Sequence, residues 1–227
     1  MHYALLLFPG FEALDAFGPL EVLNTLAEKD QIQLSILSET PQPVSTHSPD
    51  PNSHVLGSLC TQEIVPTGTF NDFLTPDRIP SLESESKIKK RIDVLIVPGG
   101  AGTRFPAVIN PVIQFIKEIY PDVQYALSVC NGSGVFARAG ILDGKRATTN
   151  KTLYESTISL RKEVNWVRNA RWVVDGNLWT ASGVSAGIDA TLAFVRSVYG
   201  VKIAGEIARE IEYVWDEGED GTRDSFA

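Results

Sequence analysis

Hydrophobic and polar positions divide the chain into alternating strand-like and helix-like segments. Tyr3 to Phe8 is a continuous apolar run, which is typical of a strand buried on both faces of a parallel sheet. Leu14 to Ala27 has helical spacing, with a break expected at Gly18-Pro19. Ile32 to Leu37 alternates apolar and polar residues and predicts a second strand. The chain therefore opens with a strand-helix-strand unit.

The middle of the chain combines irregular segments with one further buried strand. Residues 41–58 are rich in Pro, Ser, Thr and His and predict a loop, and residues 75–91 are polar and charged and predict a surface insertion. Between them we expect a short strand at Ile64–Val65 and a turn or short helix at Phe70–Leu74. Ile92 to Val97 resumes the buried-strand pattern and stops at Pro98-Gly99-Gly100.

Strand and helix patterns continue to alternate in the second half. The predicted elements are a helix at 110–120, a strand and a helix around Cys130 ending near Gly140, a short strand at 146–149, a helix at 153–162, a hairpin at 171–180 turning at Asp175-Gly176-Asn177, helices at 186–199 and 203–215, and a frayed acidic tail at 216–227. This order predicts an α/β fold: a doubly wound, mostly parallel sheet between helices, with an added small hairpin. We expect one domain over residues 1–227, with a variable insertion around 41–91.

Composition and charge narrow the range of partners. The 227-residue chain is 43% hydrophobic and carries a formal net charge of −8, with a sequence pI near 4.9. Nucleic-acid binding needs clustered Lys and Arg, but the nearest basic run, Lys87 to Arg91, is flanked by Glu83 and Glu85. No apolar run approaches the roughly 20 residues that span a bilayer, and the start lacks a basic leader. We therefore expect a soluble protein that binds neither nucleic acid nor membrane.

The few cysteines and histidines argue against a metal site. Cys60 and Cys130 lie far apart with no C-x-x-C spacing, and the three histidines are His2, His47 and His54. We expect no metal, no cofactor and a reducing, cytoplasmic location. A disulfide between the two cysteines stays open at this point.

Cys130 stands where a nucleophile elbow would place its central residue. Residues 125–129 are apolar and β-prone, and Asn131-Gly132-Ser133-Gly134 forms a small-residue turn that opens an Ala-rich helical segment. The following helix would direct its N-terminal amides at the sulfur and favour the thiolate. A buried, inert cysteine is the alternative interpretation.

Several blocks in this order resemble a known superfamily. They are Phe8-Pro9-Gly10-Phe11 with Leu14-Asp15 and Gly18-Pro19; residues 93–102; residues 129–134; residues 139–144 with 146–149; and residues 182–184 with 186–189. The chain is similar to the ThiJ/PfpI superfamily, a relative of the class I glutamine amidotransferases, and within it resembles the isonitrile hydratase branch. The resemblance implies a flavodoxin-like fold and a homodimer.

The resemblance also implies roles for individual residues. Asp15 matches an acidic residue beside the elbow cysteine and would act as a catalytic acid or base, although a loop aspartate or helix cap is the alternative. The backbone amides of Gly100 and Asn131 match an oxyanion-hole-like pocket. The remaining expected pocket-lining residues are Gly99, Gly132, Thr149 and Asn150.

Two departures from the superfamily pattern bear on the chemistry. Many proteases and aldehyde-acting members have His directly after the cysteine, where this chain has Asn131, and the hydratase-like branch often has His where this chain has Asn150. The three histidines lie outside the matching blocks. A Cys-His mechanism therefore lacks an evident base unless the loop 41–58 folds into the site.

The resemblance implies a cofactor-free hydro-lyase that hydrates an isonitrile, or a similar small electrophile, to an N-substituted formamide with Cys130 as nucleophile and Asp15 as acid/base. A glyoxalase-type activity on methylglyoxal is the second hypothesis. A redox-sensing, stress-response protein with an oxidisable Cys130 is the third. A transcription-regulator role is disfavoured, because no basic helix-turn-helix follows Trp215.

Overall fold

A seven-stranded sheet forms the centre of the molecule. The computed structural model describes residues 1–53, 57, 60–74 and 91–215. The strand order is β10-β11-β7-β6-β1-β2-β5, and every neighbouring pair is parallel except β10 and β11. The strands are β1 (His2–Leu6), β2 (Gln33–Ser38), β5 (Gly68–Thr69), β6 (Val94–Val97), β7 (Tyr125–Ser128), β10 (Trp172–Asp175) and β11 (Leu178–Ala181). The predicted α/β class and the predicted hairpin are confirmed, and the hairpin extends the main sheet at one edge.

Two short strand pairs lie outside this sheet. They are β3 (Val44–Ser45) with β4 (Glu63–Ile64), and β8 (Arg146–Ala147) with β9 (Asn165–Trp166). The segment 41–58, expected to be loop throughout, thus contributes one strand of an antiparallel pair.

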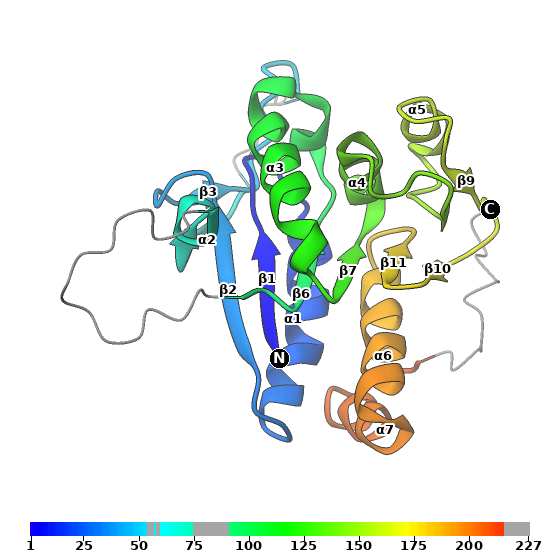
Figure 1. Ribbon diagram of the computed structural model, residues 1–227. Helices are drawn as coiled ribbons and strands as arrows, with labels where there is room; N and C mark the ends of the chain where they lie inside the picture. The colour runs from blue at the N-terminus through cyan, green and yellow to red at the C-terminus, as the bar shows by residue number, and fades with distance from the viewer. Residues whose placement is uncertain (54–56, 58–59, 75–90, 216–227) are drawn as a thin grey trace, which may run out of the picture.

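Helices cover both faces of the sheet. They are α1 (Ala13–Ala27), α2 (Asn71–Leu74), α3 (Pro106–Ile119), α4 (Ser133–Ala139), α5 (Tyr154–Ile158), α6 (Ala186–Tyr199) and α7 (Val201–Glu210), with 3₁₀ turns η1 (Ala101–Arg104), η2 (Tyr120–Asp122) and η3 (Cys130–Gly132). Helices α1, α6 and α7 pack against one another, and α3 packs against α4. Figure 1 shows α3 in front of the sheet and α1 behind it.

The helix α1 continues through the expected break at Gly18-Pro19. Proline removes one hydrogen bond from a helix interior, but packing compensates here. A Cβ added at Gly18 would lie 2.9 Å from Ile188 Cγ1 of α6, so Gly18 lets the two helices approach closely, and Pro19 is buried.

Three other helix boundaries differ from the prediction. Helix α3 begins four residues before Asn110, because Pro106 takes the first helical turn, where a missing N–H costs nothing. Helix α7 ends at Glu210 rather than Trp215, since Glu212 adopts a left-handed φ of 51° that a helix cannot continue through. Helix α5 spans only Tyr154–Ile158 because the chain turns at Ser159.

The core explains the continuous apolar runs of the sequence. Residues 3–8 are each no more than 1% exposed, as expected for a strand between two layers of helices. Strand β6 is also buried at every position. Because β1, β6 and β7 are parallel neighbours, the loops that follow them meet at one edge of the sheet.

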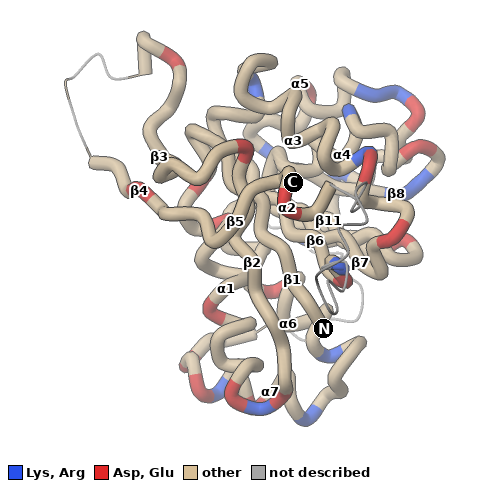
Figure 2. Tube along the Cα trace, turned by 60° about the vertical axis from the view of Figure 1, so that its left-hand side comes forward, with Lys and Arg blue, Asp and Glu red and all other residues tan. Residues whose placement is uncertain are grey.

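Charged residues are interspersed along the chain trace (Figure 2). Among the described residues, Lys145 pairs with Asp175, Arg168 with Glu155, and Arg161 with Asp143. Residues 75–90 of the expected insertion and the tail 216–227 lie outside the described residues. No helix in the described part of the chain is long and apolar enough to cross a membrane.

Candidate active site

Cys130 occupies a sharp turn between β7 and α4. Its φ of 57° is left-handed, which is uncommon for a residue with a side chain. The turn is fixed by two backbone hydrogen bonds, from Val129 N–H to Val97 O at 3.0 Å and from Gly132 N–H to Val129 O at 2.9 Å. A strained, over-determined cysteine after a strand has the geometry of a nucleophile elbow.

Gly132 allows this turn to press against the loop after β6. A Cβ at this position would lie 2.6 Å from Val97 O and 2.8 Å from Pro98 O. Any larger residue would push the elbow away from that loop. Gly132 thus shapes the backbone around the sulfur, which is more than the pocket-lining role predicted for it.

Asp15 lies in the first turn of α1 and is fully buried. Its Oδ2 accepts a hydrogen bond from Gly99 N–H at 2.8 Å, and its Oδ1 has no partner among the described residues. Glu12, the residue before α1, is bound to the same turn, because its N–H donates to Gly99 O at 2.9 Å. The structure therefore brings Asp15, Gly99 and the elbow together.

Burial controls the protonation of this acid. Desolvation raises the pKa of Asp15 to about 7, although the Gly99 amide lowers it; Glu12 raises it further and a hydrogen bond with the Cys130 thiol lowers it. At neutral pH the carboxyl group is therefore poised between its two forms, which suits a general acid or base.

The pKa of Cys130 is also raised. Burial is the largest cause, and the nearby Asp15 charge is the second; hydrogen bonds from the Asn131 backbone and the Asn150 side chain act in the opposite direction without prevailing. The Asn131 amide thus favours the thiolate, as expected for the first amides of the elbow, but burial opposes the thiolate more strongly. A base that takes the thiol proton would therefore assist attack by the sulfur.

Asn131 does more than contribute a backbone amide. Its Oδ1 accepts a hydrogen bond from Gly100 N–H at 2.8 Å, and its Nδ2 donates to Thr103 Oγ1 at 2.8 Å and to Gly100 O at 3.2 Å. Of the two amides expected to form an oxyanion-hole-like pocket, that of Asn131 faces the sulfur, and that of Gly100 is already engaged.

Thr149 and Asn150 reach the elbow from the loop after β8. Thr149 is fully buried and its hydroxyl donates to Cys130 O at 3.2 Å. Asn150 hydrogen-bonds the Cys130 side chain, and its Oδ1 accepts Leu153 N–H at 3.1 Å. Both predicted residues therefore contact the cysteine.

A cavity of about 470 Å³ opens beside this cluster. Asn150 both contacts Cys130 and lines the cavity, so the cavity adjoins the elbow, although Cys130 itself is only 6% exposed and is not a lining residue. The other lining residues are Leu14, Lys151, Thr152, Arg171, Ser182, Gly183, Val184 and Ser185. Its size fits a small organic molecule.

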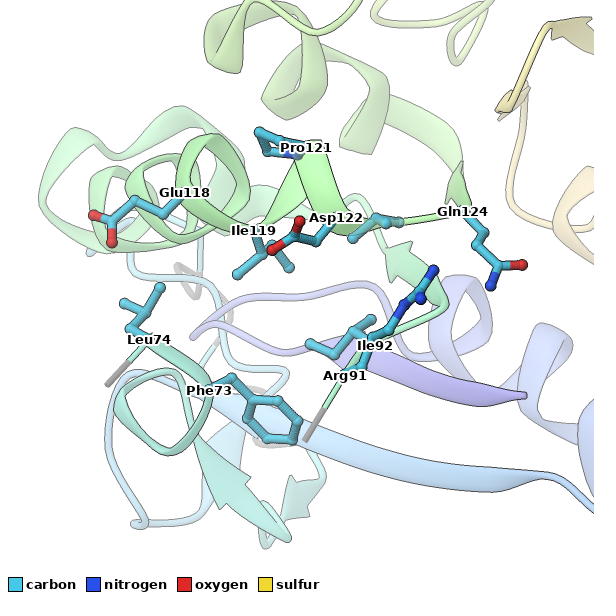
Figure 3. Close-up of a pocket in the computed structure, with 10 residues that line it drawn as sticks. Phe73, Leu74, Arg91, Ile92, Glu118, Ile119, Pro121, Asp122 and Gln124 are labelled. Carbon is cyan, nitrogen blue, oxygen red and sulfur yellow. The ribbon is translucent and has the colours of Figure 1, made fainter. Parts of the chain in front are cut away.

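A larger hollow, of about 610 Å³, lies at the other end of the sheet (Figure 3). It is lined by Phe73, Leu74, Arg91, Ile92, Glu118, Ile119, Pro121, Asp122, Val123 and Gln124. Ile92 precedes β6 and Gln124 precedes β7, so this hollow is at the amino ends of strands whose carboxyl ends carry the cysteine. Among the described residues that line it there is no cysteine, serine or histidine, and we assign it no chemistry.

The histidines of the described chain do not provide a base for Cys130. His2 hydrogen-bonds Arg91 O and Ser35 Oγ at the amino end of the sheet. The loop 41–58 does reach the first site loop, because Gly10 N–H donates to Ser45 O, but the His47 ring bonds Ser48 O in its own loop. His54 lies outside the described residues.

Sequence reasoning missed two contributors to the site. Thr103 holds the Asn131 side chain from the turn after β6, and the segment 182–185 forms a wall of the cavity. Thr103 directly follows the matched block 93–102, and the segment 182–185 overlaps the block 182–184. The sequence therefore indicated where these residues lie but not what they contact. The described residues hold no group of three or more His, Cys, Asp or Glu side chains suited to a metal, and both described cysteines are free.

The site combines a strained cysteine at the carboxyl edge of a parallel sheet with a buried aspartate. These features define the class of protein: a doubly wound α/β fold that carries a cysteine on a nucleophile elbow. The sequence model of the DJ-1/PfpI family matches residues 1–197. The chain belongs to the DJ-1/PfpI family, and the predicted ThiJ/PfpI resemblance is confirmed.

Individual relatives give a finer comparison. An isonitrile hydratase of Pseudomonas putida is 32% identical over 213 residues, which cover 94% of this chain and 78% of that protein. A deglycase of Thermococcus kodakarensis is 29% identical over 90 residues, covering 40% of this chain and 52% of that protein. The crystal structure of a ThiJ/PfpI family protein from Pseudomonas syringae superposes with a TM-score of 0.71 at 25% identity, covering 95% of this chain and 76% of that one.

Proposed function

We propose that the protein hydrates an isonitrile to an N-substituted formamide, with Cys130 as nucleophile and Asp15 as the group that moves the protons. The observation that carries the proposal is the buried Asp15 beside a buried thiol, with the pKa of Asp15 raised to about 7. The similarity to an isonitrile hydratase over nearly the whole chain supports the same reaction.

The first step joins sulfur to carbon. Ionised Asp15 takes the proton of the Cys130 thiol as Sγ bonds to the terminal carbon of the isonitrile. The electron pair left on that carbon then accepts the same proton from Asp15. The product is a thioimidate on Cys130, and Asp15 is ionised again.

Water completes the reaction. It adds to the carbon of the thioimidate C=N bond, the electron pair of that bond moves to nitrogen, and nitrogen takes a proton that Asp15 relays. The C–S bond then breaks, the hydroxyl proton passes through Asp15 to sulfur, and the N-substituted formamide leaves. One isonitrile and one water give one formamide, with no oxidant or cofactor.

Asp15 is suited to this relay because it must both accept and release a proton in each turnover. A carboxyl group whose pKa is near the working pH does both with little penalty. The Gly99 amide holds one oxygen of the carboxyl group, and the Cys130 thiol hydrogen-bonds the same group. This carboxyl group would therefore exchange protons with sulfur, substrate and water.

A glyoxalase-type reaction on methylglyoxal is the second candidate. The similarity to a deglycase over 40% of the chain favours it. In that reaction Cys130 would add to the aldehyde carbon and form a hemithioacetal. A proton would then have to move between adjacent carbons, and Asp15 is the acid/base group that the described site offers for it.

We further propose a homodimer in the cytoplasm that acts on a small electrophile without metal or cofactor. The free state of both described cysteines supports a reducing compartment. The size of the cavity beside Asn150 supports a small substrate. Family membership supports the dimer.

Steady-state turnover of an alkyl or aryl isonitrile tests the proposal, with the formamide as measured product. We expect turnover by the wild type and its loss in both Cys130→Ala and Asp15→Asn. Cys60→Ala is the matched control, since Cys60 is exposed, and should turn over like the wild type. Absence of turnover by the wild type would refute the hydratase, and methylglyoxal would then be assayed with the same variants.

A further inference from the structure

The side chain of Asn131 accepts a hydrogen bond from the Gly100 backbone amide. That amide would otherwise be available to donate to a substrate oxygen. Gly100 N–H donates to Asn131 Oδ1 at 2.8 Å, in a turn where Gly100 has a φ of 126°. Asn131 is only 6% exposed, and the hydrogen bond is partly buried. Opening such a bond without a replacement partner costs free energy.

Three further hydrogen bonds hold the Asn131 side chain in place. Its Nδ2 donates to Thr103 Oγ1 at 2.8 Å and to Gly100 O at 3.2 Å, and Thr103 Oγ1 donates to Gly100 O at 2.8 Å. The Thr103 carbonyl is in turn bound by Arg138 at 2.7 Å. The orientation of the amide group is therefore set by its surroundings, with oxygen toward the Gly100 amide.

The occupied donor lies at the elbow, because Asn131 directly follows Cys130 in the chain. A Cβ added at Gly99 would overlap Asn131 Oδ1 and lie 2.9 Å from both Asn131 N and Asp15 Oδ2. The turn at Gly99-Gly100 therefore packs against the backbone amide that hydrogen-bonds Cys130. The Asn131 side chain accepts the Gly100 amide of that same turn.

We propose that Asn131 is a specificity-determining residue that withholds the Gly100 amide and so disfavours substrates whose reaction places negative charge on oxygen. Attack of Cys130 on an ester or aldehyde moves the C=O electron pair onto oxygen, and each preorganised donor to that oxygen is worth roughly 100-fold to 1,000-fold in rate. Attack on an isonitrile leaves the electron pair on carbon, and the later addition of water moves a pair to nitrogen. Withholding one oxyanion donor therefore lowers the rate of the isonitrile reaction little and the rate of the carbonyl reaction strongly.

This inference rests on the proposed role of Cys130 as nucleophile and adds the reason for its substrate class. It assigns Asn131 an indirect role, since its side chain acts through the Gly100 amide. The residue after the cysteine thereby favours reactions that leave the electron pair on carbon over reactions that move it to oxygen. Both kinds of reaction use the same sulfur and the same aspartate.

The test compares an ester with an alkylating agent that needs no oxyanion donor. With p-nitrophenyl acetate, Sγ bonds to the acyl carbon, the bond to nitrophenolate breaks, Asp15 holds the thiol proton, and water then hydrolyses the thioester. We expect Asn131→Ala to raise the acylation rate constant at least tenfold, by analogy with the gain of one oxyanion donor. Alkylation by iodoacetamide should rise by less than a third of that factor, because it senses only access to sulfur.

Two controls fix the interpretation. Asn165→Ala removes an exposed amide that bonds Gly144 O and does not line the cavity, so its ester rate should stay at the wild-type level. Adding Cys130→Ala to Asn131→Ala should abolish the gain. If Asn131→Ala does not fold, Asn131→Ser replaces it, since a serine hydroxyl is too short to take the place of the amide oxygen.

An unchanged ester rate in the folded alanine or serine variant would overturn the inference. So would an equal rise in ester and iodoacetamide rates, or an equal gain in Asn165→Ala. The isonitrile assay is run in parallel on the wild type, and its failure would refute the hydratase while the ester comparison still decides the role of Asn131.

Discussion

The two ends of strands β1, β6 and β7 contrast sharply. At the carboxyl ends, a cavity of about 470 Å³ adjoins three buried polar side chains, Asp15, Asn131 and Thr149, each of which hydrogen-bonds the backbone of the elbow or of the loop after β6. At the amino ends, a hollow of about 610 Å³ is lined by ordinary apolar and charged side chains. Buried, hydrogen-bonded polar side chains therefore locate the chemistry here better than the volume of a hollow does.

The largest expected effect is on turnover. Replacement of the nucleophile, Cys130→Ala, should lower kcat/KM for an isonitrile by at least about 1,000-fold, since it removes the sulfur that bonds the isonitrile carbon. At the opposite end, Glu118→Gln should leave kcat/KM within about twofold, in keeping with a typical surface substitution. A comparable loss from Glu118→Gln would show that the hollow at the amino ends of the strands takes part in the reaction.

The second effect is a pH dependence of stability that originates at Asp15. Its folded pKa, about 7, lies above the ordinary unfolded value of about 3.9. Between these values the folded state holds a proton that the unfolded state has lost, so the free energy of unfolding falls as the pH rises from about 4 to about 7. A shift of about three pKa units corresponds to at most roughly 4 kcal/mol.

Asp15→Asn isolates this contribution from the other titrating groups. Asn cannot titrate, and its side-chain oxygen can still accept the Gly99 amide. Denaturant unfolding at several pH values should show the wild type losing stability relative to the variant as the pH rises through this range. Parallel curves for the two proteins would show that Asp15 has an ordinary pKa.

The third effect separates a packed glycine from an open one. Gly99→Ala would force a Cβ to within 2.9 Å of Asn131 N and Asp15 Oδ2, and such overpacking costs about 1 to 3 kcal/mol. Gly205 lies inside α7 with open space where a Cβ would be, so Gly205→Ala should stabilise by about 0.5 to 1 kcal/mol. Thermal or denaturant unfolding measures both, and a shift of the same sign for the two would contradict the described packing.

The fourth effect concerns the contact of Asn150 with the sulfur. Because Asn150 Oδ1 accepts Leu153 N–H, its NH₂ group is the end that can donate to the developing thiolate. Loss of one hydrogen bond to a charged group costs about 1.5 to 3 kcal/mol, so Asn150→Ala should lower kcat by roughly tenfold or more.

The matched control for this contact is Asn165→Ala. Asn165 is an exposed amide that bonds Gly144 O and is not among the lining residues of the cavity, so its variant should keep the wild-type kcat. An unaltered kcat in Asn150→Ala would remove Asn150 from the reaction.

Much of the fold was predictable because its signals are local. Continuous apolar runs identified β1 and β6, and the turn at 175–177 identified the hairpin. Packing between residues distant in sequence was not predictable. The helix α1 continues through the expected break at Gly18-Pro19, where Gly18 packs closely against Ile188 of α6.

The site shows the same division. Position on an elbow indicated Cys130, and the superfamily resemblance indicated Asp15. The protonation of the pair could not be predicted, because it depends on burial between α1 and the elbow, which only the assembled fold creates. The contact between Asn131 and Gly100 was equally hidden, since it joins residues 31 positions apart.

The account depends most on Asp15, rather than Cys130, being the group that titrates near neutral pH. The direct measurement is the ultraviolet absorbance of the thiolate as a function of pH, taken as the difference between the wild type and Cys130→Ala so that Cys60 cancels. We predict no thiolate signal from Cys130 at neutral pH, because burial raises the pKa of its thiol. A thiolate signal that is already complete at neutral pH would contradict the account, since it would show a standing thiolate that needs no base.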